Sequence, residues 1–202
     1  DVQTNGSLDS GLNNGGGQNF AKNHGRLSVN GVAYPAIDNQ CTTTATSVSY
    51  PARSVGGMTV SRQVSVVGGR LRQLDTITNT SGQVKLVDVD FAAKVTAGQL
   101  SVAAETGGFE IDRHDHWAVF KSAGSAFPAL QWGTDASSAH DPAVLSDNPD
   151  SPSIWRPSGP SMPSATLKYD GIQAGTGQTI RVLHVSSSTA SLADGKAVAQ
   201  DR

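Results

Sequence analysis

The sequence predicts an all-β protein: an antiparallel β-sandwich of two sheets, with a long proline-rich loop and a polar N-terminal arm. Three observations support this fold class. Short runs of β-branched residues alternate apolar with polar side chains, and glycine turns separate them. The 202 residues include 22 glycines, and only 16% are charged. No amphipathic helix of useful length is evident, and we count about nine to eleven short strands, as in sandwiches and barrels.

The chain length fits one domain with a core of its own. Residues 1–19, "DVQTNGSLDSGLNNGGGQN", offer few side chains for a core, so we expect a flexible or surface-draped arm. Residues 20–202 then form the sandwich domain. The single cysteine, Cys41, cannot form an internal disulfide. We interpret it as a small buried hydrophobe, with a reactive thiol or an intermolecular bridge as alternatives.

The first expected element is a hairpin. Leu27 and Val29 alternate with polar residues, Asn30-Gly31 turns the chain, and Val32 resumes the pattern. The best-supported piece follows in residues 58–95, where Gly68-Gly69 and Ser81-Gly82 divide three alternating runs. We predict a three-strand meander there, whose last strand turns one set of apolar side chains inward: Val87, Val89, Phe91, Ala93 and Val95.

Two further strands are expected in residues 99–105 and 109–122, separated by Gly107-Gly108. Residues 122–163 contain seven prolines and many Asp, Asn and Ser residues, so we predict that they form no continuous strands. Such a long irregular connection is often functional. Residues 165–188 supply two closing strands, and 191–200 favours a short terminal helix.

Arg62 occupies an unexpected position, because it shares the parity of the apolar residues around it, Met58, Val60, Val64 and Val66. A buried guanidinium needs an ionic partner. Asp75 lies on the next strand, and the midpoint between the two residues falls between Gly68 and Gly69. We therefore predict an Arg62–Asp75 ion pair that fixes the strand register, with a ligand site as the alternative.

The segment "DRHDH" is a candidate metal site. On a strand, Asp112, His114 and His116 share one face, and two such histidines with a carboxylate can bind Zn²⁺. Ordinary exposed histidines are the alternative. The loop "HDPAVLSDNPDSPS" offers oxygen ligands for Ca²⁺, although it lacks the EF-hand spacing and also fits a solvated turn: Asp141, Asp147, Asn148 and Asp150. No cofactor is otherwise expected.

Two tryptophans, Trp132 and Trp155, lie in the proline-rich segment. On exposed loops they could stack on sugar rings, which makes them candidate ligand-binding residues; capping the open end of the sandwich is the alternative.

The composition also limits the kinds of partner that the chain is expected to bind. The net charge of −2 and the pI of about 6.2 argue against nucleic acid and anionic membranes. No run approaches the ~18 apolar residues of a membrane span. The first residue is Asp1, and charges are few, so we expect a processed protein at the cell surface or outside the cell.

Residues 58–95 resemble a β-sandwich module of large secreted or surface-attached bacterial proteins. Later parts of that pattern match Trp117 in "HDHWAVF", "HDPAVL" at 140–145 and "TIRVLHV" at 179–185, so that the resemblance covers about residues 25–200. The same sequence pattern of strands is similar to that of the super-sandwich domains found beside the catalytic parts of some polysaccharide-active enzymes, within the galactose-mutarotase-like group. One departure is "KSAGSAFPALQWG", where that pattern has an Asp-rich stretch.

The resemblance implies an extracellular, non-catalytic module with a structural, adhesive or carbohydrate-associated role. We expect no enzyme, since the sequence lacks G-x-S-x-G, H-E-x-x-H, a phosphate loop and a dinucleotide fingerprint. Two alternatives stay open. One is a carbohydrate-binding or accessory domain that contacts polysaccharide or another cell-surface component. The other is a self-associating subunit of a secreted assembly or filament.

Overall fold

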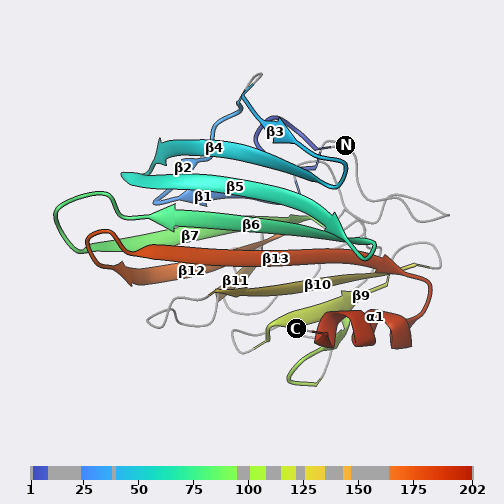
Figure 1. Ribbon diagram of the computed structural model, residues 1–202. Helices are drawn as coiled ribbons and strands as arrows, with labels where there is room; N and C mark the ends of the chain where they lie inside the picture. Colours follow the sequence, from blue (N-terminus) through green and yellow to red (C-terminus); the bar gives the residue numbers. More distant parts are fainter. Residues whose placement is uncertain are drawn as a thin grey trace.

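The computed structural model describes residues 2–8, 24–37, 40–94, 101–107, 115–121, 126–134, 143–146 and 164–201. These residues form two stacked antiparallel sheets, which confirms the predicted all-β sandwich (Figure 1). The larger sheet has the order β3-β4-β5-β6-β13-β10-β9-β8, and the smaller one has the order β11-β12-β7-β1-β2.

The strands of the larger sheet, in spatial order, are β3 (Thr42–Thr43), β4 (Ser47–Val55), β5 (Met58–Val67), β6 (Arg70–Thr78), β13 (Thr179–Thr189), β10 (Phe127–Thr134), β9 (Trp117–Phe120) and β8 (Ser101–Ala104). Those of the smaller sheet are β11 (Ala143–Ser146), β12 (Ser164–Ala174), β7 (Lys85–Lys94), β1 (Arg26–Val29) and β2 (Val32–Ala33).

The main core lies between the sheets, because alternate residues of each strand point inward. On β7 the inward residues are those predicted, Val87, Val89, Phe91 and Ala93, each at most 1% exposed. Val95 lies outside the described residues. On β5 the same parity is buried from Met58 to Val64, but Val66 is 48% exposed. The row of buried apolar side chains on β5 therefore ends at Val64, before the strand itself ends at Val67.

Both predicted glycine turns of the hairpins are present. Val29 pairs with Val32 across Asn30-Gly31, and both turn residues have positive φ, at 49° and 74°. Val67 pairs with Arg70 across Gly68-Gly69. Positive φ at both central positions is the type I′ geometry, which matches the twist of antiparallel strands. Each turn fixes its strand register, because one residue of slippage would turn the inward residues outward.

The predicted three-strand meander is wrong at its second turn. β5 and β6 pair along their whole length, but the chain then passes Ser81-Gly82 and enters the opposite sheet, where β7 pairs with β1 and β12. β6 instead pairs with β13. The alternation of β7 is compatible with either sheet, since both inner faces of a sandwich require the same pattern.

The proline-rich segment contains two strands, which contradicts the expectation that it forms none. β10 pairs with β13 over eight residues, including Pro128 opposite Ser188. The ladder with β9 covers only Ala129–Gln131, so the missing N–H of Pro128 removes no bond from it. β11 pairs with β12 further along.

The first residues of the predicted N-terminal arm are packed on the sandwich, which is compatible with the surface-draped alternative. Residues 2–8, which we call the N-terminal strap, lie against the sandwich, and Leu8 is only 2% exposed. The strap closes on itself through a bridge between Val2 and Leu8. Residues 9–19 lie outside the described part of the chain.

The C-terminal helix α1 (Leu192–Gln200) forms as predicted, with the Ser191 hydroxyl accepting the Asp194 N–H. It packs on β9, β10 and β13 (Figure 1). It covers the outer face of β9, where Trp117 and Val119 are buried with Ala199, while Ala118 and Phe120 face the main core. Among the described residues, no helix is long and apolar enough to cross a membrane.

Helix α1 approaches β9 closely at Gly195, where an added Cβ would meet Val119 Cγ1 at 2.9 Å. We expect Gly195→Val to lower the free energy of unfolding by about 1–3 kcal/mol through overpacking. Ala197→Val, at an exposed position of the same helix, is the control and should change stability little. Urea denaturation compares the two. Equal effects of both variants would contradict the docked position of α1.

Candidate functional site

The predicted ion pair between Arg62 and Asp75 is present inside the sandwich. The two residues are opposite each other on β5 and β6, as predicted from their equal distance to the Gly68-Gly69 turn. Arg62 Nε donates to Asp75 Oδ1 at 2.6 Å, and Nη2 donates to Oδ2 at 2.9 Å. Both side chains are fully buried. This bidentate ion pair offsets the desolvation cost of burying an arginine among apolar side chains.

Three side-chain donors on neighbouring strands point at the N-terminal strap. Arg62 Nη1 donates to the Asn5 carbonyl at 3.1 Å, and Gln73 Nε2 donates to the Gly6 carbonyl at 2.9 Å. On β4, the Tyr50 hydroxyl donates to the Gln3 carbonyl at 2.8 Å. The strap is therefore held by its main-chain oxygens, which explains why its side-chain composition did not predict its burial.

Two buried histidines lie deeper between the sheets. His24 Nε2 is 2.8 Å from Ser186 Oγ, and His184 Nε2 is 3.2 Å from the Tyr169 hydroxyl. The His184 ring stacks on Phe91 with centroids 3.5 Å apart. Burial, with a smaller effect of the Arg62 charge, lowers the pKa of His24 to about 3 and the pKa of His184 well below its usual value. Both rings are therefore neutral at pH 7.

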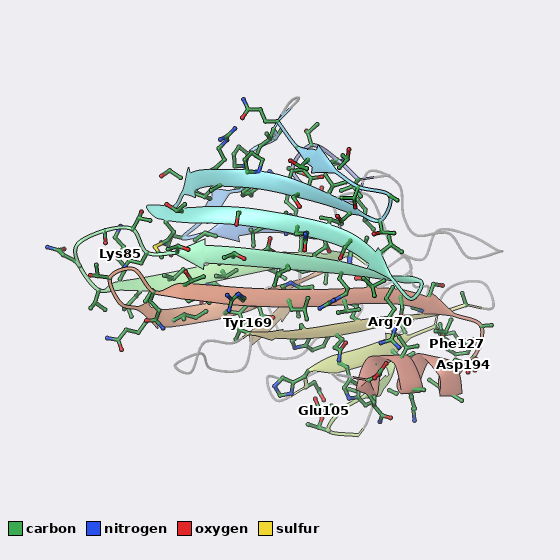
Figure 2. The ribbon with its side chains drawn as sticks, viewed as in Figure 1. Arg70, Lys85, Glu105, Phe127, Tyr169 and Asp194 are labelled. Atoms are coloured by element: carbon green, nitrogen blue, oxygen red, sulfur yellow. The ribbon has the colours of Figure 1, made fainter. Side chains whose placement is uncertain are left out.

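A second acid–base pair lies at the edge of the larger sheet. Glu105 Oε2 is 2.9 Å from His116 Nδ1 and also accepts the His116 main-chain N–H at 2.8 Å. Both side chains are about one-third exposed. The neighbouring Asp115 carboxylate is buried and accepts the Thr106 N–H at 2.7 Å. Figure 2 shows Glu105 at the rim beside β9, away from Tyr169 in the sandwich interior.

The predicted metal site is only partly visible. Asp112 and His114 lie outside the described residues, as do the proposed calcium ligands Asp141, Asp147, Asn148 and Asp150. His116 pairs with Glu105. Within the described part of the chain, no group of three or more His, Cys, Asp or Glu residues could hold a metal ion. The metal site stays a prediction.

Trp132 does not lie on an exposed loop, so the predicted roles in sugar stacking and in capping do not fit it. It belongs to β10, opposite His184, and is 4% exposed in the main core. Because β10 pairs with β13, the indole faces inward with the alternation of that strand. Its Nε1 has no hydrogen-bond partner among the described residues. Trp155 lies outside the described residues.

Cys41 is half-buried and packs against the main core. Its Sγ lies 3.9 Å from the Ile37 carbonyl, and burial raises the pKa of the thiol. This environment fits the interpretation as a packing residue, since a raised pKa disfavours the reactive thiolate.

The sequence did not single out Tyr50, Gln73 or the Glu105–His116 pair. The inward parity of Gln73, between Leu71 and Asp75, was a usable signal, because a polar residue in an apolar row needs a partner. Glu105 and His116 lie eleven residues apart, one just after β8 and one just before β9, and no local sequence pattern links them.

No protein-family model and no curated protein sequence matches the chain. Solved structures do match. A galactose mutarotase-like protein from Lactobacillus casei ATCC 334 has a TM-score of 0.59 at 10% identity and covers 93% of this chain and 95% of its own. The Slr1438 protein from Synechocystis sp. PCC 6803 has a TM-score of 0.51 at 11% identity, with 94% and 76% covered.

A heparinase III gene product has a TM-score of 0.53 at 9% identity, with 85% of this chain and 25% of its own covered. The chain thus spans about a quarter of that enzyme. The expectation that the chain is not an enzyme is contradicted, because these neighbours include proteins named for a mutarotase and a heparinase. At these identities the likeness shows the fold alone: the chain is a two-sheet β-sandwich, similar to the solved structure of the galactose mutarotase-like protein.

Proposed function

We propose that the chain is a carbohydrate-active domain and that Glu105 and His116 provide its acid–base group. The observation that carries this proposal is a carboxylate–imidazole contact of 2.9 Å, partly open to solvent, at the edge of a sandwich that resembles a galactose mutarotase-like protein over 93% of this chain. Glu105 directly follows β8 and His116 directly precedes β9, so the paired ends of these two strands bring the side chains together.

Chemically, such a pair suits proton transfer to and from sugar oxygens. Opening a sugar ring requires removal of a proton from the anomeric hydroxyl and delivery of one to the ring oxygen. When His116 Nδ1–H donates to Glu105, the carboxylate fixes the ring orientation, and Nε2 becomes the proton-accepting nitrogen. No metal or redox group is needed for this step.

The proposed setting is a larger secreted or surface-attached bacterial protein that contacts polysaccharide. Support comes from the low charge content and from the heparinase III neighbour, in which this fold is one part of a longer chain. Detection of the intact protein in the culture medium or on intact cells tests the location. Its absence from both would contradict it.

Activity is tested by following the interconversion of α- and β-D-galactose by NMR. We expect His116→Asn and Glu105→Gln each to lower the rate by at least about a hundredfold, the usual range for loss of general acid–base catalysis. Lys168→Gln is the matched control, since it breaks another partly exposed ion pair, the 3.1 Å contact with Asp170. Unchanged rates in the first two variants would exclude the pair as the acid–base group.

A further inference from the structure

We propose that the N-terminal strap, residues 2–8, covers a second carbohydrate site inside the sandwich and acts as an internal stand-in for its ligand. The site consists of Tyr50, Arg62 and Gln73, and its ligand is a neutral sugar. This inference rests on the proposed carbohydrate function, but it concerns a site separate from Glu105 and His116.

The first argument is the convergence of three donors on one segment. Tyr50 and Arg62 are opposite each other on β4 and β5, and Gln73 lies two residues from Asp75 on the inner face of β6. All three are buried, at 4%, 2% and 0% exposure. Each donates to a strap carbonyl, at 2.8, 3.1 and 2.9 Å respectively. A row of fixed donors facing acceptor oxygens is the arrangement that recognises hydroxyl groups.

The second argument is the way the strap is built. Its internal contacts, the 2.7 Å bond from the Gln3 N–H to the Ser7 carbonyl and the Val2–Leu8 bridge, close it into a compact loop. It adds no strand to either sheet. Backbone bonds join it to the domain, from Leu8 N–H to the His24 carbonyl at 2.9 Å and from Ile37 N–H to the Thr4 carbonyl at 3.0 Å. The strap can leave while both sheets stay paired.

The charge distribution decides the class of ligand. Asp75 binds Arg62 through both carboxylate oxygens, so the guanidinium charge is already compensated. An anion such as phosphate would meet no uncompensated cation from these three residues. Tyr50 and Tyr34 form an edge-to-face pair with centroids 6.5 Å apart, which provides an aromatic wall for the apolar face of a sugar ring. A neutral sugar fits both features.

A substitution at Gly6 can displace the strap while the three donor side chains of the site stay unchanged. Its φ is +78°, and an added Cβ would lie 2.4 Å from Arg62 Cδ and 3.3 Å from Tyr50 Cε2. Gly6→Ala therefore pushes the strap off the site. Gly177→Ala is the matched control, since Gly177 has a φ of +72° but an added Cβ there meets nothing within 4 Å. The two variants share the backbone strain and differ in the contact.

The experiment titrates D-galactose and D-glucose into the full chain and its variants, with sodium phosphate as the anionic probe. We expect Gly6→Ala to bind at least one of the two sugars about tenfold more tightly than the wild type or Gly177→Ala, because the strap no longer competes. Adding Tyr50→Phe to Gly6→Ala should remove most of that gain. In the wild type, saturating sugar should accelerate hydrogen exchange at the Ile37 amide, since its acceptor on the strap leaves.

If Gly6→Ala does not fold, Leu8→Ala loosens the strap by removing its buried anchor and carries the same expectation. Equal sugar affinity in the strap variants and the wild type overturns the inference, as does tighter binding of phosphate in place of sugar. The two proposals can be disproved independently. If the sugar-interconversion rate depends on His116 but Gly6→Ala does not change sugar affinity, only the strap site is excluded. If Gly6→Ala raises sugar affinity but the rate does not depend on His116, only the acid–base role of Glu105 and His116 is excluded.

Discussion

Replacing Arg62 by alanine is expected to lower the free energy of unfolding by about 3–5 kcal/mol, because it leaves the Asp75 carboxylate buried without its ionic partner. Asp75 is 0% exposed, and Arg62 supplies hydrogen bonds to both of its oxygens. The same substitution also removes the donor to the strap at Asn5. Urea denaturation at pH 7 measures the loss.

Arg70→Ala provides the matched control for this experiment. Arg70 Nη2 also contacts a carboxylate, Asp201 Oδ2 at 2.8 Å, but the two side chains are 26% and 67% exposed. Solvent screens such a pair, so its loss should cost no more than about 1 kcal/mol. If Arg62→Ala and Arg70→Ala lower the free energy of unfolding by the same amount, water must reach the Arg62 guanidinium. The burial of the Arg62–Asp75 pair would then be disproved.

Acidification is expected to lower the free energy of unfolding already at pH values well above those at which carboxylates titrate. The pKa of His24 is lowered to about 3 by burial and by Arg62, and the pKa of His184 is lowered by the same causes. In the unfolded chain both titrate near pH 6.5. Below that pH the unfolded state binds more protons than the folded state, so stability falls with pH until the folded-state pKa values are reached.

The loss approaches about 1.4 kcal/mol per pH unit for a histidine that stays neutral in the fold, which gives about 2 kcal/mol for His24 between pH 7 and pH 5, and His184 adds to it in the same direction. Unfolded carboxyl groups titrate near pH 4, so this window isolates the histidines. Urea denaturation at several pH values gives the slope. His24→Asn and His184→Asn should each make the slope smaller, whatever they cost at pH 7. A flat profile above pH 5 would show that the histidines are hydrated.

The ion pair was predictable because a two-residue glycine turn fixes the register of every residue pair around it. Once Gly68-Gly69 was placed, the position opposite Arg62 followed by counting, and Asp75 occupies it. The same logic gave the Asn30-Gly31 hairpin and the inward face of β7. These features depend on neighbours that are close in the sequence, where turn chemistry and alternation act directly.

The candidate sites were less predictable, because they join residues that no local pattern connects. The strap is bound through the main-chain carbonyls of Gln3, Asn5 and Gly6, and a carbonyl has the same chemistry in every residue. Trp132 was misplaced, since prolines nearby suggested a loop while the pairing of β10 with β13 made it a core residue.

The strand class, the glycine turns and the Arg62–Asp75 register could be predicted, because they follow from side-chain alternation and short-range backbone geometry. The fold was needed to show that β7 crosses to the second sheet, that residues 2–8 lie over Tyr50, Arg62 and Gln73, and that Glu105 contacts His116. Both inner faces of a sandwich require the same alternation, so alternation does not distinguish the two sheets. Which strands pair, and which segment covers a row of buried polar side chains, depends on packing between distant parts of the chain.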